Sequence, residues 1–138
     1  MKDSQSKAKK GETAGNFPIT IYHNPACGTS RNVLNMIRAA GYEPTVIEYL
    51  KTGWTRPQLE GLLKAMSAGP RDILRKKTAE IEKPELLNPS TSDAAILAAM
   101  IAQPVLVERP IVVTPKGTRV ARPADSALDL LERKPPAG

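Results

Sequence analysis

The sequence contains a single cysteine, Cys27, among its 138 residues. One thiol cannot form an intramolecular disulfide, and it cannot build a metal site that needs several thiolates. A disulfide-stabilised secreted scaffold and a Cys-rich metal protein are therefore excluded. Cys27 is either a small buried apolar residue or a working thiol.

Long apolar runs are missing as well. No stretch is long enough to span a bilayer, and the chain has no apolar segment of the kind that signal peptides carry. We therefore expect a soluble, cytoplasmic protein with no membrane partner. Aromatic residues make up only 4% of the chain, so the core must consist mainly of Leu, Ile, Val and Ala.

The chain has 20 Lys and Arg against 14 Asp and Glu, which gives a formal net charge of +6. Such an excess is compatible with nucleic acid, an anionic membrane or a small anionic substrate. The basic residues are scattered without interleaved aromatics, so we expect no nucleic-acid partner. Residues 1–16 are basic and polar, which is typical of a disordered tail. We expect one domain over residues 17–133 and a disordered end at residues 134–138.

The residue pattern of the first part of the chain predicts a β-α-β order. It predicts a strand at residues 19–22, a helix at 29–40 that stops at Gly41, and a strand at 45–49. A crossover of this length joins parallel strands by the right-handed rule. We therefore expect the two strands to be parallel neighbours.

The middle of the chain is expected to be helical. Thr55 and Gln58 form a capping box, which predicts that a helix with an apolar stripe follows. Beyond it we expect a short helix at residues 71–76, then a polar irregular stretch at 77–89 with room for one turn of helix. A further helix is expected from Thr91 or Ser92 to Ala102.

The end of the chain predicts a hairpin and a closing helix. Strands are expected at residues 111–114 and 118–120 around a turn, followed by a helix at 123–132. The element order indicates an α/β protein with a thioredoxin-like mixed sheet, a helical insertion and flanking helices. Such folds place a cis-proline just before the third strand, so we predict a cis bond between Arg109 and Pro110.

Cys27 is placed for nucleophilic chemistry, because it follows a strand and begins a helix. Unpaired backbone N–H groups at a helix start favour the thiolate over the thiol. His23 could lower the thiol pKa in its charged form, which is the role that we favour, or it could hold the loop by hydrogen bonding. The loop could cradle a tetrahedral oxyanion against the sulfur. Its possible supporting residues are Asn24, Gly28, Thr29, Ser30 and Arg31.

The absence of a second cysteine also limits the chemistry that Cys27 can complete on its own. Ser30 stands where the second sulfur of a Cys-x-x-Cys pair would be. Any covalent intermediate on Cys27 must therefore be resolved by an external thiol.

Residues 19–32 closely resemble the active-site segment of the glutaredoxin-dependent arsenate reductases. The resemblance resumes at residues 71–76, is strong again over 109–123, and covers about residues 17–133 in all. It implies that Cys27 attacks arsenate and that His23 lowers the pKa of Cys27. It also implies that three arginines hold the oxyanion, namely Arg75, Arg109 and Arg122.

The same resemblance implies the reaction and its partners. Arsenate would be reduced to arsenite in arsenic detoxification, with glutathione as co-substrate and glutaredoxin as the external reductant. No bound cofactor and no metal would be needed.

Three other functions remain as alternatives. Some relatives with this fold bind RNA polymerase and influence transcription, and a monothiol glutaredoxin-like enzyme would act on protein–glutathione mixed disulfides. Neither function requires the three arginines together. A phosphatase-type arsenate reductase is disfavoured, because its loop has five residues between Cys and Arg, whereas three separate Cys27 from Arg31.

Overall fold

A computed structural model describes residues 17–135, which form two compact units. The first unit contains residues up to Glu48 and from Arg109 onward, and the second contains Tyr49–Glu108. The tail expected at residues 1–16 and the last three residues of the expected C-terminal end lie outside the described residues. Within residues 17–135, no helix is both long and apolar enough to cross a membrane.

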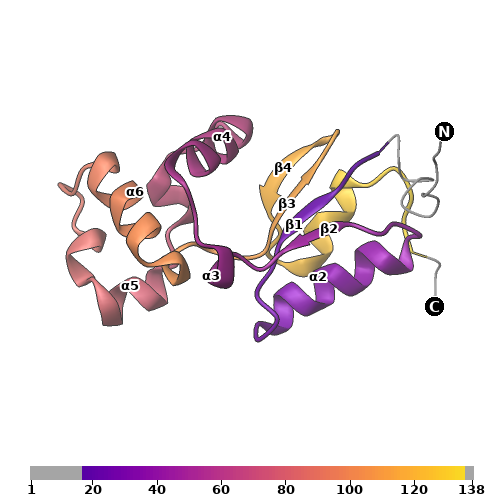
Figure 1. The fold of residues 1–138 in the computed structure, drawn as a ribbon, viewed down its shortest axis with the longest axis horizontal. Helices are drawn as coiled ribbons and strands as arrows, with labels where there is room; N and C mark the ends of the chain where they lie inside the picture. The colour runs from indigo at the N-terminus through magenta and orange to yellow at the C-terminus, as the bar shows by residue number, and fades with distance from the viewer. Residues whose placement is uncertain (1–16, 136–138) are drawn as a thin grey trace. The chain divides into compact units, whose positions relative to one another are not determined.

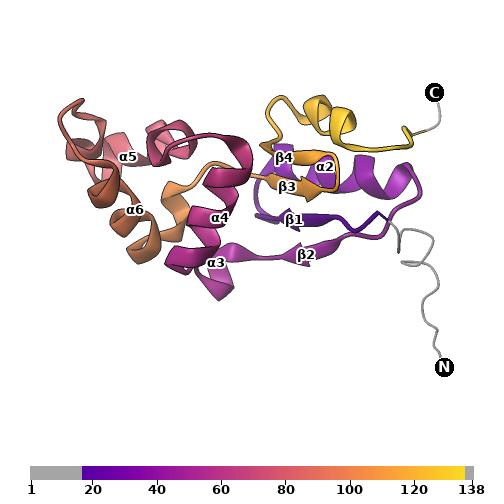
Figure 2. The same cartoon turned by 90° about the horizontal axis from the view of Figure 1, so that it is seen from above.

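The first unit is built on a four-stranded mixed sheet (Figure 1). Its strands are β1 (Thr20–Tyr22), β2 (Thr45–Ile47), β3 (Ile111–Thr114) and β4 (Gly117–Val120), in the order β2-β1-β3-β4. β1 and β2 are parallel, and Figure 2 shows them side by side. β3 is antiparallel to both β1 and β4. The mixed α/β sheet, the parallel pair and the terminal hairpin are thus confirmed.

Two helical segments cover one face of this sheet. The α-helix α2 (Gly28–Ala39) and the 3₁₀ helix η5 (Ala124–Leu130) contact each other. They share one apolar core with Ile21 of β1 and Val112 of β3, which are opposite each other in the sheet. The helix expected at residues 123–132 is therefore present as a shorter 3₁₀ helix. The core fixes the position of α2 against the strand from which its N-terminal loop emerges.

The peptide bond between Arg109 and Pro110 is cis, which confirms the prediction. The bond between Arg122 and Pro123 is also cis, and the sequence analysis did not predict it.

The second unit is helical throughout most of its length. Its α-helices are α3 (Tyr49–Thr52), α4 (Arg56–Met66), α5 (Lys76–Glu82) and α6 (Asp93–Ala102). Short 3₁₀ helices connect them, namely η2 (Pro70–Ile73), η3 (Pro84–Leu87) and η4 (Pro104–Leu106). The helical insertion that the element order predicts is therefore present, and α6 begins at its expected place, with Ser92 as the N-cap.

Three local predictions in this region were wrong. The strand expected to reach Tyr49 ends at Ile47, because Tyr49 is fully buried in α3 and stacks on Trp54 at 5.2 Å. The helix expected at residues 71–76 is interrupted, because Leu74 forms a β-bridge with Val107. The stretch expected to be irregular with at most one helical turn begins instead with the seven-residue helix α5. Its one buried residue, Ala79, gives almost no apolar periodicity.

The capping box before α4 is formed as predicted, and its contribution to the free energy of unfolding should be measurable. The Thr55 hydroxyl accepts from the Gln58 N–H at 3.2 Å, and the Gln58 side chain accepts from the Thr55 N–H at 3.2 Å. We expect Thr55→Ala to lower the free energy of unfolding by about 1 kcal/mol in urea denaturation. Thr52→Ala is the matched control, since Thr52 is exposed at the end of α3, and a change of similar size there would contradict this role for Thr55.

Candidate active site

The loop between β1 and α2 carries the cysteine. The His23 N–H donates to the Ile47 carbonyl at 2.8 Å, which extends the pairing of β1 with β2. The chain then turns, with the Cys27 N–H donating to the Asn24 carbonyl at 3.0 Å. Cys27 is the N-cap residue of α2 and has an extended backbone conformation. The sulfur therefore stands at the N-terminus of a three-turn helix, as the sequence predicts.

The environment of the Cys27 thiol favours its ionised form. The residue is only 9% exposed, and burial alone would raise the thiol pKa. The Ser30 N–H, the side chain and charge of Arg109, and the Thr29 N–H together outweigh burial and hold the pKa of Cys27 below its ordinary value. The positive pole of α2 and one guanidinium thus prepare a thiolate.

His23 belongs to a buried hydrogen-bond network in this loop. It is 5% exposed, and its Nδ1 lies 2.7 Å from the Oγ of Ser30. The Asn24 N–H donates to the same Oγ at 3.1 Å. The Asn24 side chain in turn accepts from the Ala26 N–H at 3.0 Å. The network ties the end of β1 to the first turn of α2 around the cysteine.

The charge state of His23 bears on its role. Burial lowers the His23 pKa; the Glu48 carboxylate opposes this shift, and Arg38 and Arg31 add to it. The net lowering of the His23 pKa favours the neutral imidazole. The sequence analysis favoured a charged His23 that lowers the thiol pKa, whereas the burial of the ring and its contact with Ser30 favour the role in which it holds the loop.

The other loop residues are placed as follows. The Arg31 guanidinium donates to the Pro25 carbonyl at 2.9 Å, so it turns back over the loop. Thr29 contributes its N–H to the thiolate. A Cβ added to Gly28 would lie 3.8 Å from the Arg31 guanidinium, which is an ordinary contact. Gly28 is therefore not required for close packing.

Of the three predicted arginines, Arg109 contacts the cysteine and Arg122 contacts the backbone of Arg109. Arg109 precedes β3 and bonds to Cys27, while the Arg122 guanidinium donates to the Arg109 carbonyl at 3.0 Å. The hairpin explains why they meet, because Ile111 of β3 pairs with Val120 of β4. The residues just before β3 and just after β4 therefore lie together. Arg122 is exposed, so its side chain is accessible to an anion.

Arg75 belongs to the second unit. It is the residue before α5, is half-buried, and donates to the Thr78 hydroxyl at 2.7 Å. Its role as a third oxyanion ligand stays a prediction from the family resemblance.

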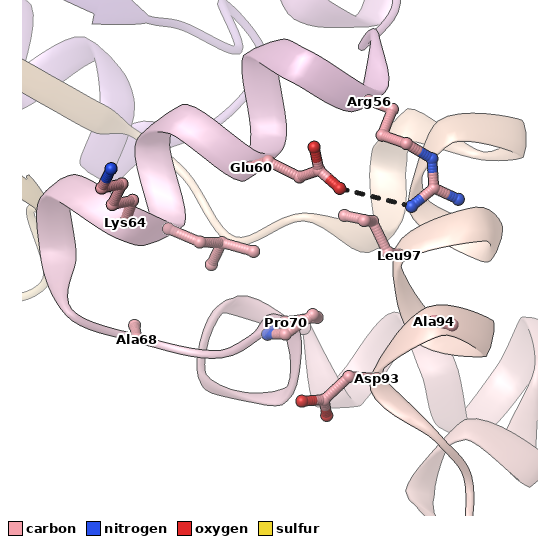
Figure 3. A pocket seen from close by; sticks show the side chains of 9 residues that line it. Arg56, Glu60, Lys64, Ala68, Pro70, Asp93, Ala94 and Leu97 are labelled. Atoms are coloured by element: carbon pink, nitrogen blue, oxygen red, sulfur yellow. Dashed lines mark hydrogen bonds and ion pairs between the residues drawn. The ribbon is translucent and has the colours of Figure 1, made fainter.

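The second unit also has a groove that the sequence analysis did not assign to any site (Figure 3). The groove has a volume of about 410 Å³. Its lining residues are Arg56, Glu60, Leu63, Lys64, Ala68, Pro70, Asp93, Ala94 and Leu97. An ion pair of 3.5 Å joins Arg56 to Glu60 on its rim. The lining has neither cysteine nor histidine, so the thiol chemistry stays with the loop around Cys27.

The sequence analysis understated one residue. Ser30 was predicted only as possible loop support, yet its N–H lowers the pKa of Cys27 and its hydroxyl contacts His23. The one available signal was the Cys-x-x-Ser spacing, which places Ser30 in the first turn of the helix that Cys27 begins.

A mixed sheet of order β2-β1-β3-β4, with one cysteine of lowered pKa at the start of the helix after β1, defines a thioredoxin-like protein with a single thiol. The sequence model of the ArsC family matches residues 22–130. The chain belongs to this family, as its sequence resemblance predicts.

Known proteins similar to this chain carry the name arsenate reductase. The arsenate reductase ArsI2 of Synechocystis is 56% identical over 117 residues, which are 85% of this chain and 84% of the relative. An arsenate reductase of Escherichia coli K12 is 49% identical over 113 residues, or 82% and 80% of the two chains. The solved arsenate reductase of Vibrio cholerae has a TM-score of 0.77 at 35% identity, over 83% of this chain and 98% of that one. The likeness confirms the thioredoxin-like fold.

Proposed function

We propose that this protein reduces arsenate to arsenite in arsenic detoxification, with Cys27 as the nucleophile. The observation that carries the proposal is the Cys27 thiol, whose pKa is held low by Ser30 and Thr29 N–H groups and by Arg109. The names of the relatives that are 56% and 49% identical supply the substrate.

Arsenate is a tetrahedral oxyanion, and the loop offers it donors of the matching kind. The Arg109 guanidinium bonds to Cys27, and the Arg122 guanidinium lies at the Arg109 carbonyl. Planar guanidinium forks suit tetrahedral oxyanions. The family resemblance adds Arg75 as a third cation. Arginine charge near the sulfur also stabilises the additional negative charge that develops during attack.

The reaction requires two electrons from external thiols. The Cys27 thiolate attacks arsenic, an S–As bond forms, and one oxygen leaves as water after protonation. The glutathione thiolate then attacks the Cys27 sulfur, and the electron pair of the S–As bond stays with arsenic, which leaves as arsenite. Cys27 is left in a mixed disulfide with glutathione. A glutaredoxin thiolate attacks the glutathione sulfur and returns Cys27 to the thiolate.

The need for an external thiol follows from the cysteine count. Cys27 is the one cysteine of the chain, so no second thiol of its own can displace arsenite or glutathione. Glutathione and glutaredoxin keep thiols reduced in the cytoplasm, which is the location that we propose for the reaction.

An NADPH-coupled assay tests the proposal directly. With arsenate, glutathione, glutaredoxin and glutathione reductase, we expect NADPH oxidation that depends on the protein and on each component. Thioredoxin with thioredoxin reductase should not replace the glutathione system. Arsenate-dependent turnover that is equal with thioredoxin alone would contradict the proposed reductant. A protein that shows no turnover with either system, although its thiol is reactive, would contradict the proposed activity.

A further inference from the structure

The half-buried guanidinium of Arg75 has no counter-charge of its own. Other arginines pair with carboxylates, in the pairs Arg38–Glu43, Arg56–Glu60 and Arg119–Asp129. Within residues 17–135, Arg75 pairs with no carboxylate, and the Thr78 hydroxyl is the one group that its side chain bonds to. Partial burial of a cation without a counter-charge is unfavourable, and the guanidinium keeps N–H donors for an anion. These contacts leave Arg75 available to an anionic ligand.

The backbone of Arg75 is fixed on both sides by the second unit. The Arg75 N–H donates to the Leu106 carbonyl at 2.7 Å, and the Arg75 carbonyl accepts from the Ala79 N–H at 3.0 Å, where α5 begins. The preceding residue, Leu74, forms a β-bridge with Val107. The direction in which the Arg75 side chain leaves the backbone is therefore set, and the remaining freedom lies in its rotatable side-chain bonds.

The Thr78 hydroxyl restricts this remaining freedom. Thr78 lies three residues after Arg75, a spacing that brings two side chains together at the start of a helix. Its hydroxyl accepts from the Arg75 guanidinium at 2.7 Å, and both residues are half-buried. Threonine is β-branched and has few rotamers, so the accepting oxygen is itself held in place. The bond uses one guanidinium N–H and leaves the others to an anion.

We propose that Thr78 is a positioning residue for oxyanion binding, whose hydroxyl holds the Arg75 guanidinium in place before arsenate arrives. The inference rests on the proposed function, in which Arg75 is the third cation at the oxyanion. A flexible side chain that is ordered in advance loses less entropy on binding, which strengthens binding by about three- to tenfold. Thr78 acts through Arg75 and takes no part in the chemical step.

Thr78→Val tests the proposal, because valine keeps the shape of threonine and removes the hydroxyl. We expect the KM for arsenate to rise by about three- to tenfold, with kcat near the wild-type value. Thr78→Ser should restore the KM. Thr91→Val is the matched control, because the half-buried Thr91 donates its hydroxyl to a backbone carbonyl of the same unit, that of Glu85 at 2.6 Å. An unchanged KM in Thr78→Val, or an equal rise in Thr91→Val, would overturn the proposal.

A double-mutant cycle shows whether Thr78 acts through Arg75. Arsenate affinity is measured by calorimetry without glutathione, so that no turnover is needed. In the Arg75→Ala background, Thr78→Val should weaken arsenate binding no further, whereas in the wild-type background it should weaken binding by about three- to tenfold. An equal loss in both backgrounds would overturn the proposal.

The same calorimetry distinguishes this inference from the proposed function. If the wild type shows no arsenate turnover, but Thr78→Val binds arsenate more weakly than the wild type does, the proposed activity is contradicted and the positioning role is supported. If the wild type reduces arsenate, but Thr78→Val matches it in both KM and affinity, the positioning role is overturned and the activity stands.

Discussion

Cys27→Ser is expected to abolish glutathione-dependent arsenate reduction, with turnover falling by about a thousandfold or more. A serine hydroxyl remains protonated where the Cys27 thiol, with its lowered pKa, ionises. Serine oxygen also cannot form the mixed disulfide that glutathione must leave behind. The coupled NADPH assay measures the loss, and thiol titration of the unfolded variant should find no reactive sulfur, since Cys27 is the one cysteine.

The substitution is close to isosteric, so the fold should survive it. We expect the urea midpoint of Cys27→Ser to stay near that of the wild type, and arsenate should still bind, because the loop N–H groups and Arg109 are retained. If Cys27→Ser binds arsenate in calorimetry but does not reduce it, the role of the nucleophile is distinguished from that of the groups that bind the oxyanion. Residual arsenate reduction of more than a few per cent would show that another group carries the chemistry.

Features set by short sequence signals were predictable. The capping box of Thr55 and Gln58 joins residues three apart, and the turn between β3 and β4 joins neighbours in the chain. The position of Cys27 at a helix start follows from a strand pattern followed directly by a helix pattern. Each of these depends on local backbone geometry, which residue types specify directly.

Features set by long-range packing were not predictable from the residues alone. Arg109 reaches the loop because β3 is antiparallel to β1, with Ile111 opposite Tyr22, so that the residues before β3 lie beside those after β1. The family resemblance indicated this meeting, whereas periodicity in the sequence did not. The lowered pKa of His23 likewise depends on its burial, which no pattern of neighbouring residues reports.

Arg109→Ala is expected to lower kcat/KM for arsenate by about a hundredfold, the scale seen when one oriented donor is removed from an active site. Arg109 acts on Cys27 by both a hydrogen bond and its charge, and both lower the thiol pKa. Arg109→Lys retains a charge but loses the planar fork, so its activity should lie between wild type and alanine. Arg119→Ala is the control, because Arg119 donates to the Ser126 carbonyl at 3.1 Å and pairs with Asp129 at 3.3 Å.

The pH dependence distinguishes the two ways in which Arg109 can act. The thiolate is present above the pKa of Cys27, and removing Arg109 raises that pKa, so the rising limb of alkylation rate with pH should move to higher pH in Arg109→Ala. The limb should stay in place in Arg119→Ala, and an unmoved limb in Arg109→Ala would contradict the effect on the thiol. Raising the pH can restore the thiolate, but it cannot restore a lost oxyanion contact. Full alkylation with a persistent deficit in arsenate turnover at high pH would therefore show that Arg109 also binds the substrate.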